Sequence, residues 1–158
     1  MPTKTPRKSA PAASPDEAPL DQSALLRLVG YSCRRAYLHI MPLFTERMGK
    51  YELRPVDYTI LSLVNANPDL SQKRLAQAIN VSPPNLGPLL ERLEARGLLE
   101  RRRNPADQRS QVLALTSAGR TLCRKADKTA AALEDEAASV LSDSERAELL
   151  RLLQKIFL

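Results

Sequence analysis

Two charged residues, Asp107 and Arg109, stand two positions apart where the turn-forming run Asn-Pro-Ala-Asp ends. An arginine at the tip of a hairpin can enter the minor groove of DNA, where the electrostatic potential is most negative. A carboxylate two residues earlier can hold that guanidinium in one orientation through a charge-assisted hydrogen bond. The pair therefore predicts a DNA contact made by Arg109 and oriented by Asp107.

Polar and basic side chains upstream of this pair suit the same partner. Asn85 carries an amide of the kind that binds an adenine edge. Arg101 to Arg103 would alternate in direction along a strand, so at most two can face DNA together, and we assign Arg101 and Arg103. Hydroxyl and cationic side chains contact phosphate, which positions a protein without specifying sequence. The expected phosphate contacts are Ser71, Lys73, Arg74 and Ser82.

Catalytic chemistry has little support in this sequence. His39 is the single histidine and has no carboxylate near it in the chain. Cys33 and Cys123 lack the spacing of metal ligands. We therefore expect no enzyme activity, no catalytic residues, no metal and no cofactor. Cys33 is expected to be a small buried apolar residue of the first long helix.

The elements that position the DNA-contacting residues follow a helix-turn-helix pattern. Ser71 can cap a first short helix, and Asn80 and Val81 form the turn. Ser82 caps the second helix, Pro83 occupies its first position, and Gly97 ends it. Leucines at three- and four-residue spacing mark the buried face of that second helix.

One irregularity lies inside the second helix, where Gly87 is followed by Pro88. Pro88 cannot donate a hydrogen bond to the carbonyl of Pro84, so we expect a kink or a loosened first turn. The simpler interpretation is a tolerated local irregularity, which we favour. The functional one is that a bend re-aims the start of the helix in the DNA groove.

A hairpin follows this helix. A strand begins at Leu98, and Val112, Leu113 and Leu115 suit a strand that returns antiparallel to it. The expected fold class is therefore mainly α with a small β-hairpin wing: a winged helix-turn-helix flanked by long terminal dimerisation helices.

The flanking segments read as four helices. One covers residues 21–49 with a kink at Pro42, and the next starts at Pro55. Beyond the wing, Thr116 caps a helix running to about residue 139, and Ser142 caps the last helix. Their apolar surface can cover the back of their own domain or pack against another copy. Apolar stripes on both the first and the last helix favour a two-fold dimer.

The predicted organisation has a tail and one domain. Residues 1–19 hold five of the twelve prolines, a composition that cannot bury a core, so we expect a disordered basic tail. Residues 20–158 form a single domain, with dimerisation helices in 20–55 and 117–158 and the winged helix-turn-helix in 56–116.

The balance of charge agrees with a nucleic-acid partner, since the net charge of +6 suits a polyanion. Among the clustered arginines, Arg92 and Arg96 are expected to be ordinary solvated positions. No stretch approaches the roughly 20 apolar residues of a membrane helix, and no apolar core follows the basic N-terminal residues as in a secretory signal. We therefore expect a cytoplasmic protein with no membrane partner.

Residues 70–120 resemble the MarR family of bacterial transcription regulators. The likeness is carried by the Leu-Glu-Ala-Arg-Gly end of the second helix, the Asp-x-Arg at 107–109 and the Leu-x-Leu-Thr-x-x-Gly run at 113–119. The resemblance implies a homodimer whose two winged domains read a pseudo-palindromic operator in double-stranded DNA, often with release by a small ligand. Two half-sites would lie about 10 base pairs apart.

The resemblance also implies a place for the effector, between the terminal helices and the winged domain. The polar residues expected to line that cleft are Arg34, Arg35, Tyr37, His39 and Tyr58. The Asn-Leu-Gly-Pro-Leu run at 85–89 is similar to the same stretch in members of the family that respond to aromatic acids or their coenzyme A thioesters. An arginine with aromatic neighbours suits a carboxylate or phosphate joined to a ring.

Several alternatives remain open at the level of sequence. The ligand residues can instead be surface or core positions, with Tyr37 in the core and the arginines at a dimer rim. The chain can bind DNA with no effector, or serve only as a protein-binding module. A redox-sensing branch of the family carries a reactive cysteine in the first helix, but that position falls near Leu26 here, which argues against a thiol sensor.

Overall fold

The structure is a computed structural model that describes residues 20–104 and 111–158, and its chain divides into two compact units, residues 1–36 and 37–158. The first unit holds α1 (Ser23–Leu26) and the beginning of α2 (Val29–Gly49). The single helix expected over 21–49 is wrong in this detail. The Leu28 amide donates a hydrogen bond to the Leu25 carbonyl at 2.9 Å, and this turn ends α1 before α2 begins. α2 passes through Pro42 without interruption.

The second unit holds the remaining helices and one small sheet. Its helices are α3 (Pro55–Ala66), α4 (Gln72–Ala78), α5 (Pro83–Ala95), α6 (Ser117–Ala137) and α7 (Asp143–Phe157). Its strands are β1 (Leu70–Ser71), β2 (Leu99–Arg103) and β3 (Gln111–Leu115). They form an antiparallel sheet in the order β1–β3–β2, with Leu70 opposite Leu113 and Leu99 opposite Leu115. The predicted winged helix-turn-helix is confirmed, and β1 is an addition to it.

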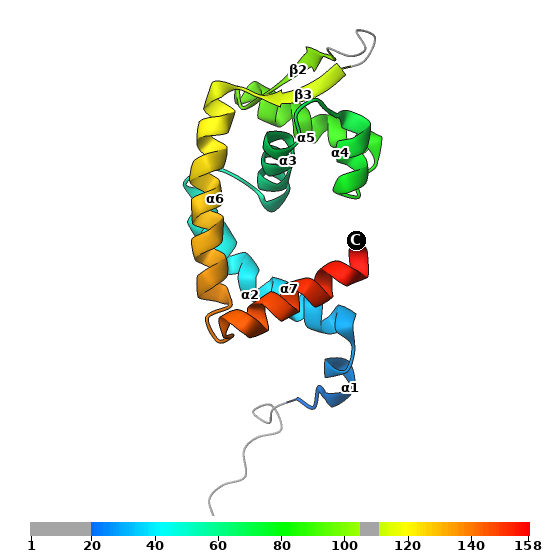
Figure 1. Cartoon of the computed structure of the whole chain (residues 1–158), viewed down its shortest axis with the longest axis vertical. Coiled ribbons are helices and arrows are strands. Elements are labelled where there is room, and N and C mark those ends of the chain that lie inside the picture. Colours follow the sequence, from blue (N-terminus) through cyan, green and yellow to red (C-terminus); the bar gives the residue numbers. More distant parts are fainter. Residues whose placement is uncertain (1–19, 105–110) are drawn as a thin grey trace, which may run out of the picture. The chain divides into compact units, whose positions relative to one another are not determined.

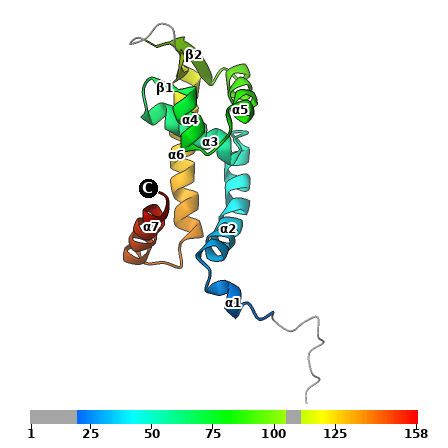
Figure 2. The same ribbon diagram turned by 90° about the vertical axis from the view of Figure 1, so that its right-hand side faces the viewer.

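The core of this unit is formed by aliphatic side chains from the helices and the sheet. Figures 1 and 2 show α3, α4 and α5 grouped with the sheet, and α6 running from the sheet to α7. The largest fully buried apolar side chains are Met48, Ile60, Leu61, Leu75, Leu90, Leu93, Leu99, Leu113 and Leu133. α7 has no buried residue, so its apolar side chains have no core of their own within this chain.

The helix starts follow the predicted caps. Ser71 precedes α4, Thr116 precedes α6, and Ser142 precedes α7, and each hydroxyl accepts a backbone amide of its helix. Pro55 occupies the first position of α3. α5 continues through Pro88 as one helix, which agrees with the simpler interpretation of that residue. A residue before proline is normally kept out of the helical region by its Cβ, so glycine at position 87 helps the helix to continue.

Candidate nucleic-acid interface

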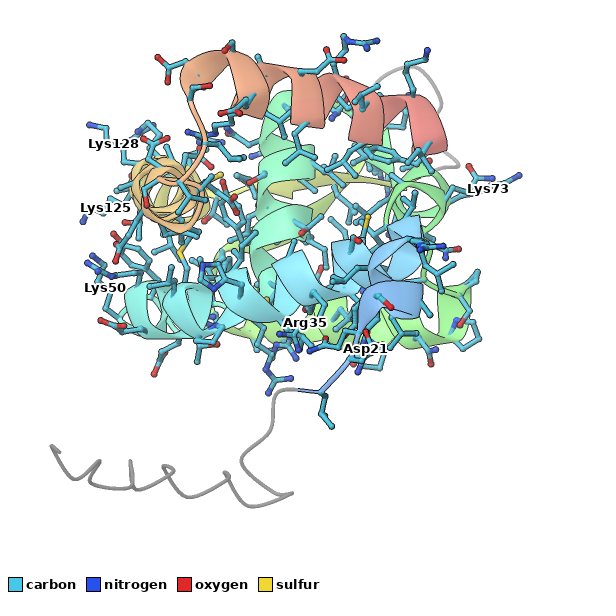
Figure 3. The ribbon with its side chains drawn as sticks, turned by 90° about the horizontal axis from the view of Figure 1, so that it is seen from below. Asp21, Arg35, Lys50, Lys73, Lys125 and Lys128 are labelled. Carbon is cyan, nitrogen blue, oxygen red and sulfur yellow. The ribbon has the colours of Figure 1, made fainter. Side chains whose placement is uncertain are left out.

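The first helix of the pair, α4, presents its basic residues to solvent. The Ser71 hydroxyl accepts the Arg74 amide at 3.3 Å, so it acts as a helix cap. Lys73 and Arg74 are exposed in the first turn. Lys73 projects outward from α4, while Lys50, Lys125 and Lys128 lie on the opposite side of the second unit (Figure 3). These four lysines therefore lie on two sides of the unit, and Lys73 is on the side of the helix pair.

The turn between α4 and α5 requires a left-handed backbone. Asn80 has φ 51°, a conformation that asparagine tolerates better than most residues, and the Val81 amide returns to the Ala76 carbonyl at 3.0 Å. Ser82 stands at the N-cap of α5, but its hydroxyl makes no capping bond, which differs from the expectation. Asn85 is exposed in the first turn of α5, as a contact to a base edge requires.

The end of α5 is fixed by a Schellman motif. Arg96 is the C-cap residue of α5. Gly97, which was expected to end the helix, follows Arg96 and has φ 64°. The Gly97 amide donates to the Glu94 carbonyl at 2.8 Å and the Leu98 amide to the Leu93 carbonyl at 3.0 Å. This geometry turns the chain directly from α5 into β2.

Arg92 and Arg96 are not ordinary solvated residues, which corrects the expectation from sequence. Arg92 forms an ion pair with Asp57, whose side chain is 1% exposed at the start of α3. Arg96 donates to the carbonyls of Tyr51 at 2.8 Å and Glu52 at 2.7 Å, in the turn between α2 and α3. Arg92 therefore ties α5 to the start of α3, and Arg96 ties the end of α5 to the turn before α3.

The wing is formed by β2 and β3, and its arginines have different surroundings. Arg101 pairs with Glu94 of α5 at 3.3 Å, and Arg102 pairs with Glu100. Arg103 is exposed and has no ion pair with another described residue. Asp107 and Arg109 lie outside the described residues.

The junction between β3 and α6 gives a structural reason for the Leu-x-Leu-Thr-x-x-Gly run. The Thr116 hydroxyl accepts the Gly119 amide at 3.0 Å and donates to the Gly97 carbonyl at 2.6 Å. The Thr116 amide donates to the Leu98 carbonyl at 3.1 Å. These bonds attach the start of α6 to the turn that follows α5.

The residues expected at an effector site are divided between the two units. Arg34 and Arg35 are exposed on the part of α2 that belongs to the first unit. Tyr37 and His39 are exposed in the second unit, which is contrary to a core position for Tyr37 in one chain. Tyr58 is half-buried in α3.

Tyr58 belongs to a polar cluster between α3 and α6 that the sequence did not reveal. The Tyr58 hydroxyl donates to a carboxylate oxygen of Asp127 at 3.0 Å, and the Ser62 hydroxyl donates to the same oxygen at 3.5 Å. The thiol of Cys123 lies 3.7 Å from the other oxygen. Burial raises the pKa of both Tyr58 and Cys123, with the Asp127 carboxylate acting in the same direction. Both groups therefore favour their protonated, neutral forms.

The expected burial of Cys33 is wrong for this chain. Cys33 is exposed in this chain and Cys123 is buried. A buried thiol whose pKa is raised carries little of the thiolate that reacts with oxidants. Cys123 is therefore suited to packing and not to redox sensing.

A hollow of about 830 Å³ lies beside the helix pair. Its lining includes the apolar residues Ala76, Val81 and Leu86 and the polar residues Lys73 and Ser82. A molecule bound there would share residues with the predicted phosphate contacts. In the described part of the chain, no group of histidines, cysteines or carboxylates is arranged to hold a metal ion, and no helix is long and apolar enough to cross a membrane.

A helix pair, a hairpin wing and exposed basic residues on α4 define the class of winged helix-turn-helix DNA-binding proteins. Comparison with known proteins gives the family. The MarR family model matches residues 53–111. A solved structure of the transcriptional repressor CouR bound to a 23-mer DNA duplex is 34% identical, covers 88% of this chain and 99% of that one, and has a TM-score of 0.80. The chain therefore belongs to the MarR family.

A second structure of the same repressor and one further relative agree with this assignment. CouR bound to p-coumaroyl-CoA is 33% identical, covers 87% of this chain and 97% of that one, and has a TM-score of 0.76. A putative transcriptional regulatory protein for the hcr operon of Thauera aromatica is 27% identical over 92% of this chain and 88% of its own length. The chain is a transcriptional repressor of the MarR type and not an enzyme.

Proposed function

We propose that this chain is a homodimeric repressor that binds a pseudo-palindromic operator and is released by an aromatic acid or its coenzyme A thioester. The observation that carries the proposal is the match, over almost the whole length of the relative, to a repressor with solved complexes of both DNA and p-coumaroyl-CoA. The exposed positions of Lys73, Arg74, Asn85 and Arg103 support a DNA surface formed by α4, α5 and the wing. The other contacts that we assign to it are Ser71, Ser82, Arg101, Asp107 and Arg109.

Exposed apolar side chains of the terminal helices support the dimer. Leu149, Leu150 and Leu152 of α7 are each 45–50% exposed, and Ile156 and Phe157 are 66% and 72% exposed. Fully burying an exposed side chain of this kind contributes about 1.5–3 kcal/mol, and the half-exposed leucines can gain roughly half of that, so water is an unfavourable environment for this face. We assign dimerisation to residues 20–55 and 117–158, and light scattering tests it directly.

Arg34, Arg35, Tyr37, His39 and Tyr58 are the residues we assign to the effector. The exposed guanidiniums suit the phosphates or carboxylate of a thioester or acid, and the tyrosines suit its ring. This chemistry favours anionic aromatic ligands over neutral ones.

Release of DNA by such a ligand is the central test. We expect p-coumaroyl-CoA or free p-coumarate to dissociate the repressor from a duplex selected out of a random pool, as followed by fluorescence anisotropy. Coenzyme A alone and benzyl alcohol are controls, since each lacks one half of the proposed chemistry. Sequence-specific binding that no anionic aromatic compound weakens would instead favour a DNA-binding protein without an effector.

The wing provides a second prediction. Substituting Arg109→Ala is expected to weaken operator binding strongly, because it removes the guanidinium proposed for the minor groove, and to leave the dimer intact. A gel shift measures the first effect and light scattering the second. Lys128→Ala is a matched control, since it removes a positive charge from the side of the unit opposite Lys73 of α4 (Figure 3). An unchanged operator affinity for Arg109→Ala would refute the wing assignment.

A further inference from the structure

The outward face of α5 is unusual for a helix that meets a polyanion, because it is largely apolar. Pro84, Asn85 and Pro88 are exposed there, opposite the buried Leu86 and Leu90. Neither proline can donate or accept a hydrogen bond through its side chain. In the first two turns of α5, Asn85 is the exposed side chain that can make bidentate hydrogen bonds to a base.

The backbone of α5 has also lost the donors that a helix start usually offers to phosphate. Pro83 and Pro84 occupy the first two helical positions and carry no N–H. The next two amides, of Asn85 and Leu86, both donate to the Ser82 carbonyl, at 2.9 and 3.1 Å. The start of α5 is therefore suited to apolar contact and not to anion binding through its amides.

One apolar group in the major groove of DNA matches such a face, the C5-methyl group of thymine. Four residues of a helix span about 6 Å, so the rings of Pro84 and Pro88 can reach bases about two steps apart on a strand. The amide of Asn85 lies beside them and suits adenine. Glu91, exposed one turn further on, repels phosphate and limits the contact to the first two turns.

We propose that α5 reads a half-site of A·T pairs, with thymine methyl groups against Pro84 and Pro88 and an adenine edge against Asn85. This inference rests on the proposed function, because it takes α5 as the helix that enters the major groove. The inference adds which base pairs that helix selects. The exposed Lys73 and Arg74 of α4 supply the positive charge that an apolar reading face lacks.

The experiment removes single methyl groups from the DNA. An operator is first selected from a random duplex pool, and each of its thymines is then replaced by deoxyuridine, which keeps the base pairing and deletes the C5-methyl group. At two positions in each half-site we expect affinity to fall about three- to five-fold, the effect of exposing one methylene-sized apolar group. At the other thymines the affinity stays within experimental error.

Protein variants then connect each methyl group to its residue. Pro84→Ala and Pro88→Ala are each expected to bind the normal operator more weakly and to become insensitive to deoxyuridine at one position. Pro68→Ala, an exposed proline of the loop before β1, retains the full pattern. Tight binding to the selected operator with no sensitive thymine overturns the inference and leaves the proposed function standing. Failure to select any sequence overturns both.

Discussion

Replacing Asp57 by alanine is expected to lower the free energy of unfolding by about 3–5 kcal/mol, because it leaves a partly buried guanidinium without its counter-charge. The Asp57 side chain is 1% exposed and that of Arg92 is 29% exposed. The same carboxylate accepts the Arg54 amide at 3.0 Å, so the substitution also removes a cap from α3. Chemical denaturation of the purified protein measures the loss.

Two controls separate the buried pair from a general loss of charge. Glu100→Ala breaks the ion pair between Glu100, whose side chain is 43% exposed, and Arg102, whose side chain is 55% exposed. Such surface pairs contribute about 0–1 kcal/mol to stability. In a second control, Asp57→Ala is combined with Arg92→Leu, which removes both charges and should recover part of the stability. A loss for Asp57→Ala no larger than that for Glu100→Ala would contradict the role given to this pair.

The pair matters for DNA binding because Arg92 belongs to α5. Arg92 and Arg96 reach back to Asp57, Tyr51 and Glu52, so the helix that carries Asn85 is held against the start of α3. A change at the junction of α2 and α3 can therefore be transmitted to α5 through these contacts. This gives a physical route by which a ligand bound near α2 and α3 would alter the fit of α5 to its operator.

The elements that sequence predicted well are those whose signals lie in consecutive residues. The hydroxyls of Ser71, Thr116 and Ser142 and the position of Pro55 mark helix starts locally, and all four are confirmed. β1 was missed because a strand of two residues shows no periodicity, and it exists only through its pairing with β3.

The contacts that sequence missed join residues that are far apart in the chain. Arg92 and Asp57 are 35 positions apart, and Arg96 and Glu52 are 44 positions apart. Because no partner lies nearby in the sequence, both arginines were expected to be solvated. Cys33 and Cys123 were similarly indistinguishable by local pattern. Which cysteine is buried depends on the packing of α6, which brings Cys123 beside Tyr58 and Ser62 of α3.

Gly119 is a residue whose importance only the fold explains. It lies in the first turn of α6, directly against the backbone of Leu98. A Cβ atom placed on it would lie 1.9 Å from the Leu98 carbonyl oxygen and 2.9 Å from its carbonyl carbon. Both atoms belong to the backbone, so no side chain can rotate away to make room. The glycine at the end of the Leu-x-Leu-Thr-x-x-Gly run is therefore required by close packing.

Substituting Gly119→Ala is accordingly expected to destabilise the protein by about 1–3 kcal/mol or more, because α6 must move away from the turn that follows α5. The direction of the change is itself a test. Alanine favours a helix over glycine by about 1 kcal/mol, so a substitution that met no obstacle would stabilise the protein. Gly49→Ala is the matched control, since a Cβ at the end of α2 meets nothing within 4 Å.

Thermal and chemical unfolding of the two variants distinguish these outcomes. Gly49→Ala is expected to keep the free energy of unfolding or raise it by up to about 1 kcal/mol, whereas Gly119→Ala lowers it clearly below that of the original protein. The movement forced on α6 would also disturb the bonds that Thr116 makes to Gly97 and Leu98, so Gly119→Ala should weaken operator binding even under conditions where the variant stays folded. Stability equal to that of Gly49→Ala would mean that α6 can separate from Leu98 at no cost, and the attachment of α6 to the end of α5 would then be loose.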